Sequence, residues 1–173
     1  YAYFLLPTAL ALGLALRAEP VPAAAGSASW LARALGLLMI VGSAWAYWEY
    51  RKVVAIYAPP RDAAPLAERI AAGQRSQLFS RHADYAAATA LGANAAALAA
   101  AQRTGWQLID ARLLIAWAKS LHAVGDTDKA RYLVERLREF RSRDGDAWLA
   151  ACGEMPDEWF CTPPEQQYSW RDF

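Results

Sequence analysis

Two cysteines, two histidines and several arginines are the side chains in this sequence that could carry chemistry. Cys152 and Cys161 lie nine residues apart in a proline-bearing segment without helical periodicity. A disulfide closing this loop would remove chain entropy worth about 2–3 kcal/mol. Half of a metal site and two inert thiols are the alternatives, although no histidine lies nearby to complete a metal site. We favour the disulfide, which would place this segment in an oxidising compartment.

The histidines and arginines give weaker signals. His82 stands in the run Arg81-His82-Ala83-Asp84-Tyr85, either as a polar residue before a helix or as a functional group. His122 comes late on an amphipathic helix, where a positive charge suits the helix dipole. Five arginines alternate with acidic residues, which favours a solvated, ion-paired face over a phosphate site: Arg131, Arg136, Arg138, Arg141 and Arg143. The sequence contains no Walker loop, nucleophile elbow or paired zinc-ligand motif, so these residues alone indicate no active site.

Charge is distributed unevenly along the chain. The net charge is +1 and 56% of the residues are hydrophobic, which excludes a strongly basic nucleic-acid binder and a disordered chain. The first 60 residues carry few charges, whereas residues 61–173 carry most of them. This split predicts a membrane part followed by a soluble part.

Two apolar runs, 1–16 and 30–50, predict a transmembrane helical hairpin. The linker 17–29 contains two prolines and small residues, which argue against one continuous helix. The first run would span about 24 Å, short of the roughly 30 Å hydrocarbon core, so a buried core helix is the alternative. Aromatic residues at both ends of the second run fit the membrane interface. Arg51 and Lys52 mark its far boundary.

The rest of the sequence predicts a small helical domain. Apolar residues recur at three- and four-residue steps, which predicts helices over 66–72, 77–89, 93–104, 107–123 and 128–141, with Gly73 ending the first of them. The last two resemble a single degenerate tetratricopeptide-like αα-hairpin.

We therefore predict an all-α chain in three parts. Residues 1–58 would form two transmembrane helices, 59–143 a helical domain, and 144–173 an irregular aromatic tail that holds the cysteine pair. The sequence begins within an apolar run and without a methionine, so we expect it to be the C-terminal fragment of a longer protein.

Several stretches together resemble the C-terminal region of bacterial protein O-oligosaccharyltransferases, which are pilin glycosylases related to O-antigen ligases and Wzy-type polymerases. This region is known as the virulence-factor membrane-bound polymerase C-terminal domain. The resemblance rests on the opening run 1–7, the two cysteines, Pro163-Pro164, and five further stretches: Gly73-Gln74-Arg75-Ser76-Gln77-Leu78-Phe79, His82-Ala83-Asp84-Tyr85-Ala86, Gly125-Asp126-Thr127-Asp128-Lys129-Ala130-Arg131, Arg136-Leu137-Arg138-Glu139-Phe140-Arg141 and Ser169-Trp170-Arg171-Asp172-Phe173.

The resemblance implies an inner-membrane glycosyltransferase. Such an enzyme moves an oligosaccharide from an undecaprenyl-diphosphate carrier to a protein hydroxyl, to another glycan or to the lipid A core. The resemblance also implies no cofactor, no nucleotide sugar and no essential metal, with the lipid-linked oligosaccharide as the donor substrate. The family's critical histidine and loop residues would lie before residue 1, so we expect no catalytic residue here and no activity from the fragment alone. The family topology would place residues 51–173 in the periplasm.

Arg75, Arg81 and His82 are candidate contacts for the donor or acceptor, chosen for charge and family position. The expected partners are membrane lipid, the undecaprenyl-diphosphate-linked glycan, and a periplasmic pilin-like protein or lipid A core, with no nucleic acid. The sequence does not distinguish ligase, protein transferase and polymerase. A non-enzymatic, membrane-anchored helical adaptor that binds a protein partner is the alternative function.

Overall fold

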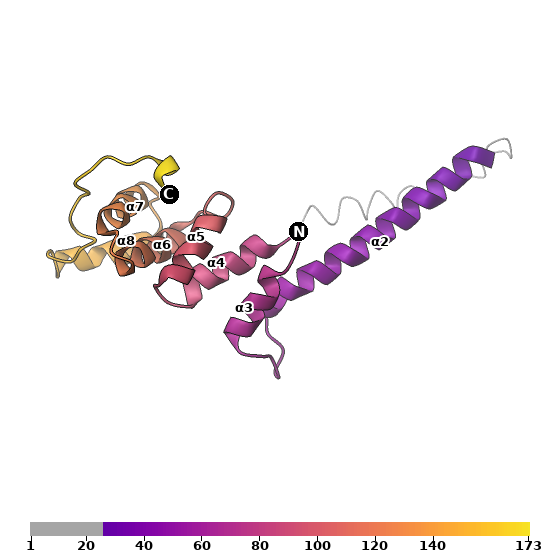
Figure 1. Cartoon of the computed structure of the whole chain (residues 1–173), viewed down its shortest axis with the longest axis horizontal. Helices are drawn as coiled ribbons and strands as arrows, with labels where there is room; N and C mark the ends of the chain where they lie inside the picture. The colour runs from indigo at the N-terminus through magenta and orange to yellow at the C-terminus, as the bar shows by residue number, and fades with distance from the viewer. Residues whose placement is uncertain (1–25) are drawn as a thin grey trace. The chain divides into compact units, whose positions relative to one another are not determined.

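The computed structural model describes residues 26–173, except for the side chains of 26–29, 31 and 32, and this part is helical without strands (Figure 1). The chain divides into two compact units, Tyr1–Trp48 and Glu49–Phe173. The predicted all-α class is therefore confirmed for the described residues. The first predicted membrane run, 1–16, lies outside them.

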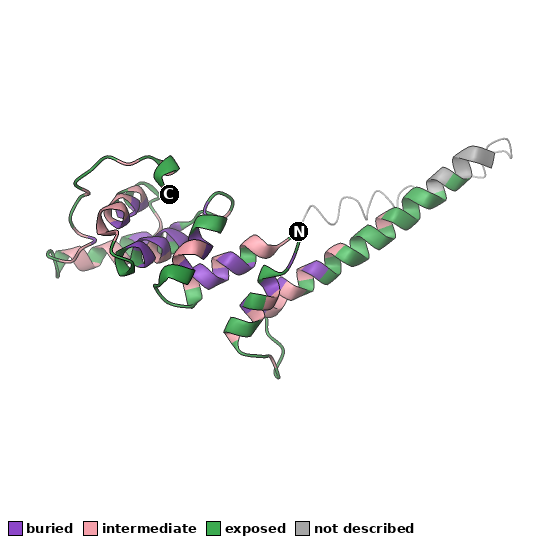
Figure 2. Cartoon of the chain, viewed as in Figure 1, coloured by how far each residue is buried: buried purple, intermediate pink, exposed green. Residues whose placement is uncertain are grey.

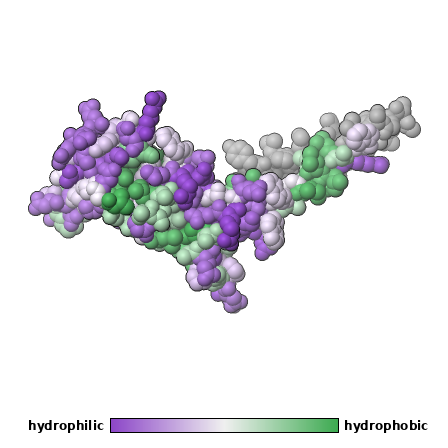
Figure 3. Space-filling view, in the orientation of Figure 1, coloured by the Kyte–Doolittle hydropathy of each residue, from purple (hydrophilic) through white to green (hydrophobic). Residues whose placement is uncertain are grey.

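Helix α2 (Gly26–Tyr57) contains the second predicted membrane run. Large apolar side chains are exposed along it (Figure 2): Trp30, Leu35, Leu37, Leu38, Ile40, Val41, Trp45, Tyr47 and Trp48. The same stretch carries a green hydrophobic band in Figure 3. Among the described residues, no helix meets the length and hydropathy that a membrane crossing requires. The transmembrane hairpin is therefore not confirmed and stays a prediction.

Residues 49–173 fold as a succession of short helices, each packed on the next. In chain order they are α3 (Leu66–Gln74), α4 (Ser80–Ala90), α5 (Ala95–Thr104), α6 (Ala111–Ala123), α7 (Thr127–Glu139), α8 (Arg143–Leu149), and the 3₁₀ turns η1 (Ala150–Gly153) and η2 (Trp170–Asp172). Helices α6 and α7 make the most extensive contact, so the predicted αα-hairpin is confirmed. Helix α6 also contacts α4 and α8, which makes it the centre of the domain.

Side-chain caps decide where several helices begin. Asn94 accepts a hydrogen bond from the Ala97 backbone N–H at 2.9 Å, and Asp110 accepts one from the Leu113 N–H at 2.8 Å. Such caps satisfy backbone donors that have no partner inside the helix. The helix predicted over 107–123 therefore begins only after Asp110. Ser142 caps α8 in the same way, and the prediction of an entirely irregular 144–173 was wrong at this helix.

Most buried residues of α3, α4 and α5 are glycine or alanine, which let neighbouring helices approach closely. Gly73 was expected to end its helix, and this prediction was wrong because α3 continues to Gln74. A Cβ at Gly73 would lie 2.8 Å from Ile56 Cδ1 and 2.9 Å from Ala83 Cβ. The glycine is thus required by the close approach of three helices and not by helix termination.

Gly105 offers a test of this close packing. Its φ of −56° is helical, so alanine would fit the backbone, but a Cβ would overlap Cζ3 of the buried Trp117 ring. We expect Gly105→Ala to lower the free energy of unfolding by about 2 kcal/mol, because overpacking forces side chains out of their rotamers. Gly153→Ala is the matched control, since a Cβ there meets no atom within 4 Å. Equal denaturation midpoints for the two variants would contradict the prediction.

The aromatic tail packs back onto α6 and α7 and arches over them as the yellow segment of Figure 1. The Phe173 ring lies 5.8 Å from that of Trp117 and stacks at 5.5 Å on Tyr132. The predicted disulfide is confirmed: Cys152 and Cys161 are bonded, with their Cα atoms 5.5 Å apart, within the usual range.

Candidate functional site

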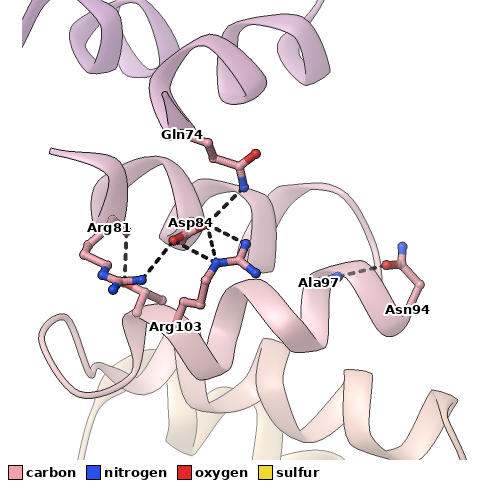
Figure 4. Close-up of polar contacts among 7 residues, drawn as sticks. Gln74, Arg81, Asp84, Asn94, Ala97 and Arg103 are labelled. Carbon is pink, nitrogen blue, oxygen red and sulfur yellow. Dashed lines mark hydrogen bonds and ion pairs between the residues drawn. The ribbon is translucent and has the colours of Figure 1, made fainter. Parts of the chain in front are cut away.

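Asp84 of α4 is the centre of a polar cluster that joins three helices (Figure 4). Its carboxylate accepts hydrogen bonds from Arg103 of α5, at 2.7 Å to Nη2 and 3.2 Å to Nε. Gln74 of α3 donates a third bond at 3.0 Å, and Arg81 Nη1 lies 3.5 Å away. The Asp84 side chain is only 5% exposed. A buried carboxylate needs such partners, because an unpaired buried charge is strongly unfavourable.

The cluster determines the surroundings of Arg81, one of the predicted donor contacts. Arg81 pairs with Asp84, and its backbone carbonyl accepts a hydrogen bond from Thr104 Oγ1 at 2.9 Å. The Asp84 carboxylate also holds the pKa of Arg103 above its ordinary value. Both guanidinium groups remain partly exposed, at 41% for Arg81 and 47% for Arg103. Two cations against one carboxylate leave a net positive charge facing solvent.

His82, the second predicted contact, is exposed beside an open cavity of about 330 Å³. The cavity is lined by Tyr57, His82, Tyr85, Leu108, Ile109 and Asp110. The Tyr57 hydroxyl donates to the His82 carbonyl, and the Tyr85 hydroxyl donates to Asp110, both at 2.8 Å. Burial and the hydrogen bond to Asp110 raise the pKa of Tyr85, so its hydroxyl stays protonated at neutral pH. This arrangement can bind a ligand through aromatic faces and an imidazole.

Arg75, the third predicted contact, lies elsewhere in the domain. It follows α3, is exposed, and borders a separate cavity of about 410 Å³ with Glu68, Arg69 and neighbouring alanines. No ion pair joins it to any described carboxylate. Arg75 and His82 thus line different cavities, while Arg81 is bound to Asp84. The structure does not gather the three residues into one site.

Sequence reasoning missed Asp128, which anchors the tail. Its carboxylate accepts hydrogen bonds from the backbone N–H groups of Glu165 at 2.7 Å and Gln166 at 3.1 Å. The Tyr168 hydroxyl donates a third at 3.0 Å. These bonds, led by that from the Glu165 backbone, lower the pKa of Asp128. Position 128 looked like an ordinary acidic residue in the first turn of a helix, and its partners lie almost forty residues away.

This geometry predicts a pH-dependent tail. A carboxylate with a lowered folded-state pKa stabilises the fold above its ordinary value of 3.8, and the stabilisation is lost as the pH falls further. We expect Asp128→Asn to lower the unfolding free energy by about 1–2 kcal/mol at pH 7. The difference from wild type should vanish in strong acid. Denaturation followed by tryptophan fluorescence between pH 7 and pH 2 measures this, and a difference independent of pH would contradict it.

His122 and two of the arginines on the predicted charged face have structural partners. His122 stacks on Trp159 with ring centroids 4.4 Å apart, and its Nδ1 lies 2.9 Å from Thr127 Oγ1. On the predicted arginine face, Arg136 pairs with Glu139 at 2.8 Å and Arg131 lies 3.9 Å from Asp128. The ion-paired face is thus confirmed for these residues. Residues 26–173 contain no group of three histidine, cysteine or acidic side chains placed to hold a metal ion.

Comparison with known proteins gives one match. The family model described as virulence factor membrane-bound polymerase, C-terminal, matches residues 1–150. No curated protein and no solved structure matches the chain. The matched range contains the Asp84 cluster, both cavities and Asp128. The two cysteines and most of the tail that Asp128 anchors lie beyond it.

Proposed function

The chain belongs to the virulence-factor membrane-bound polymerase C-terminal family, and from this membership we propose that it is the C-terminal part of an inner-membrane glycosyltransferase. The full-length enzyme moves an oligosaccharide from undecaprenyl diphosphate to a protein hydroxyl, a glycan or the lipid A core. The family match over residues 1–150 is the observation that carries the proposal. It agrees with the resemblance noted in the sequence.

We further propose that α2 crosses the membrane and that residues 51–173 lie in the periplasm. Two observations support this topology. The α2 stretch from Ala34 to Trp48 is uncharged, and its large apolar side chains are mostly exposed, as lipid contact would require. Cys152 and Cys161 are disulfide-bonded, and disulfides persist in oxidising compartments such as the bacterial periplasm.

An impermeant maleimide applied to intact cells tests the topology. Cys152 and Cys161 should be labelled only after reduction, because the disulfide blocks both thiols and the reagent reaches the periplasm. Labelling only after lysis, without any need for reductant, would place the domain in the cytoplasm and overturn the proposed topology. A variant of the full-length protein without Cys152 and Cys161 is the control, because it shows how much label binds to other thiols.

Within this enzyme, residues 59–173 position a substrate beside catalytic groups supplied by the rest of the protein. Exposed arginines suit the oxygens of a diphosphate, to which a guanidinium can donate two parallel hydrogen bonds. Arg75 is exposed without a carboxylate partner among residues 26–173, and Arg81 is held by Asp84 with part of its surface in solvent. His82 and its aromatic cavity are suited to the glycan or the acceptor.

The proposal is tested in cells that lack the gene and are supplied with the full-length protein. Wild-type protein should restore glycan transfer, seen as a mass increase of the acceptor and a fall in lipid-linked oligosaccharide. Arg75→Ala/Arg81→Ala should reduce transfer at equal protein level, whereas Arg138→Ala, an exposed arginine of α7, should not. Full transfer by the double variant would remove the two arginines from the proposal. Absence of any transfer by wild type would overturn it in favour of the adaptor.

A further inference from the structure

The Glu49 side chain of α2 binds the loop between α3 and α4. Its side chain is almost completely buried and accepts a hydrogen bond from the Gln77 backbone N–H at 2.8 Å. Lys52, one turn further along α2, pairs with the same carboxylate. The Phe79 ring meets the Tyr50 ring edge-on, with centroids 5.9 Å apart. Gln77 is thus held at Glu49 and Phe79 at Tyr50, the first two residues of the second unit.

Leu78 lies between these two fixed residues and is 47% exposed. Its Cα must lie about 3.8 Å from that of Gln77, so it stays at the level of Glu49. Arg75 on the same loop and Arg51 beside Tyr50 are exposed, and neither forms an ion pair with any described carboxylate. The loop therefore carries one half-exposed aliphatic side chain and the exposed cation Arg75, and the exposed cation Arg51 adjoins Tyr50 in the sequence. An exposed aliphatic side chain gains by entering the acyl boundary of a bilayer, and exposed cations are attracted to anionic headgroups.

We propose that loop 75–79 is an interfacial anchor, in which Leu78 enters the outer part of the lipid layer while Arg51 and Arg75 bind the phosphates of anionic phospholipids. The inference rests on the proposed crossing of the membrane by α2. Glu49 directly follows Trp48, where the uncharged stretch of α2 ends, and therefore marks the level of the headgroups. The hydrogen bond from Gln77 then places the loop at that level, and the cations complement a negatively charged surface.

Fluorescence quenching by brominated lipid tests the depth of Leu78. The full-length protein, with its other free thiols removed, is placed in nanodiscs of phosphatidylcholine and phosphatidylglycerol. Three variants carry an environment-sensitive dye: Leu78→Cys, Val41→Cys on α2, and Val124→Cys. Val124 is the matched control, because it is an aliphatic residue of similar exposure, 44%, on the turn between α6 and α7. Cys152 and Cys161 are bonded to each other and do not react.

The expected result is quenching at position 78 by lipids brominated near the headgroup, at position 41 by lipids brominated deep in the chain, and none at position 124. Quenching at 41 but not at 78 would leave the α2 crossing intact and overturn the anchor, whether the loop faces water or another protein. No quenching at 41 would overturn the crossing itself, and with it the anchor.

The contribution of charge is measured in the same nanodiscs. With all arginines present, quenching at position 78 should increase with the fraction of phosphatidylglycerol. The double variant Arg51→Gln/Arg75→Gln should lose this dependence, whereas Arg138→Gln should keep it. A phosphate of the lipid-linked glycan donor has the same chemistry as a phospholipid headgroup. The nanodiscs contain no such donor, so a dependence on phosphatidylglycerol identifies the phospholipid as the ligand. Unchanged dependence in the double variant would overturn the role of the arginines.

Discussion

Arg103→Ala is expected to lower the free energy of unfolding by about 3 kcal/mol, because it removes the main partner of a buried carboxylate. Arg103 supplies the 2.7 Å bond to Asp84 and a second bond through Nε, while Asp84 itself is 5% exposed. Without Arg103, the carboxylate keeps only Gln74 and the more distant Arg81. The charge then stays buried with poor partners, which is unfavourable. Urea denaturation of the purified chain in detergent measures the loss.

Arg81→Ala is the matched control for this prediction. It removes an arginine of similar exposure from the same carboxylate, but one whose Nη1 lies 3.5 Å from Asp84. We expect this variant to cost well under half as much, because the Arg103 fork and Gln74 still satisfy Asp84. Equal losses for the two variants would mean that Arg103 has no special part in the cluster. The comparison also checks that an Arg81 effect on glycan transfer does not arise from unfolding.

Loss of the disulfide should have a similarly large effect. Replacing Cys152 and Cys161 by serine is expected to lower the unfolding free energy by about 2.5–3 kcal/mol, chiefly because the unfolded chain regains the freedom of the closed loop. The loop also holds Trp159 and Phe160 against Trp148. Tryptophan fluorescence of the tail should therefore change before the helices unfold. Thermal melts followed by near-UV and far-UV circular dichroism separate the two events.

Reduction of the wild-type chain provides the control. Dithiothreitol should lower the melting temperature of wild type to that of the double serine variant and leave the variant itself unchanged. Wild-type melting that does not respond to the reductant, with the bond shown to be open by thiol labelling, would contradict the prediction. The aromatic packing of the tail would then be enough to maintain the melting temperature without the disulfide.

Much of the helical domain was predictable from local signals. The periodicity of apolar residues located α6 and α7, and the turn between them, because burying one face of each helix requires that spacing. The predicted starts of some helices were wrong because side-chain caps set them. Helix α6 was predicted from residue 107 but begins after Asp110, whose carboxylate accepts a hydrogen bond from the Leu113 N–H. Helix α8 was not predicted because it has only seven residues, which are too few for a periodic pattern of apolar residues to appear.

The candidate site was less predictable, because its contacts join residues far apart in the sequence. The run around His82 includes Asp84, but the sequence did not indicate that Asp84 is the centre of a polar cluster, because its partner Arg103 is nineteen positions away. The sequence also offered no sign that Gly73 lies against Ile56 and Ala83. A glycine required by close approach and a glycine that ends a helix look alike until the neighbouring helix is placed.

The alanine-lined contacts of α4 and α5 restrict how this domain can change by mutation. Seven alanines of α4 and α5 are each at most 5% exposed: Ala83, Ala86, Ala87, Ala88, Ala97, Ala100 and Ala101. A single-base change in an alanine codon yields only valine, threonine, serine, glycine, proline, aspartate or glutamate. Each of these is larger, more polar, or a poorer helix former than alanine. Almost no single-base substitution at these positions therefore leaves stability unchanged. Substitutions that the fold tolerates are expected to accumulate first on the outward faces of the helices.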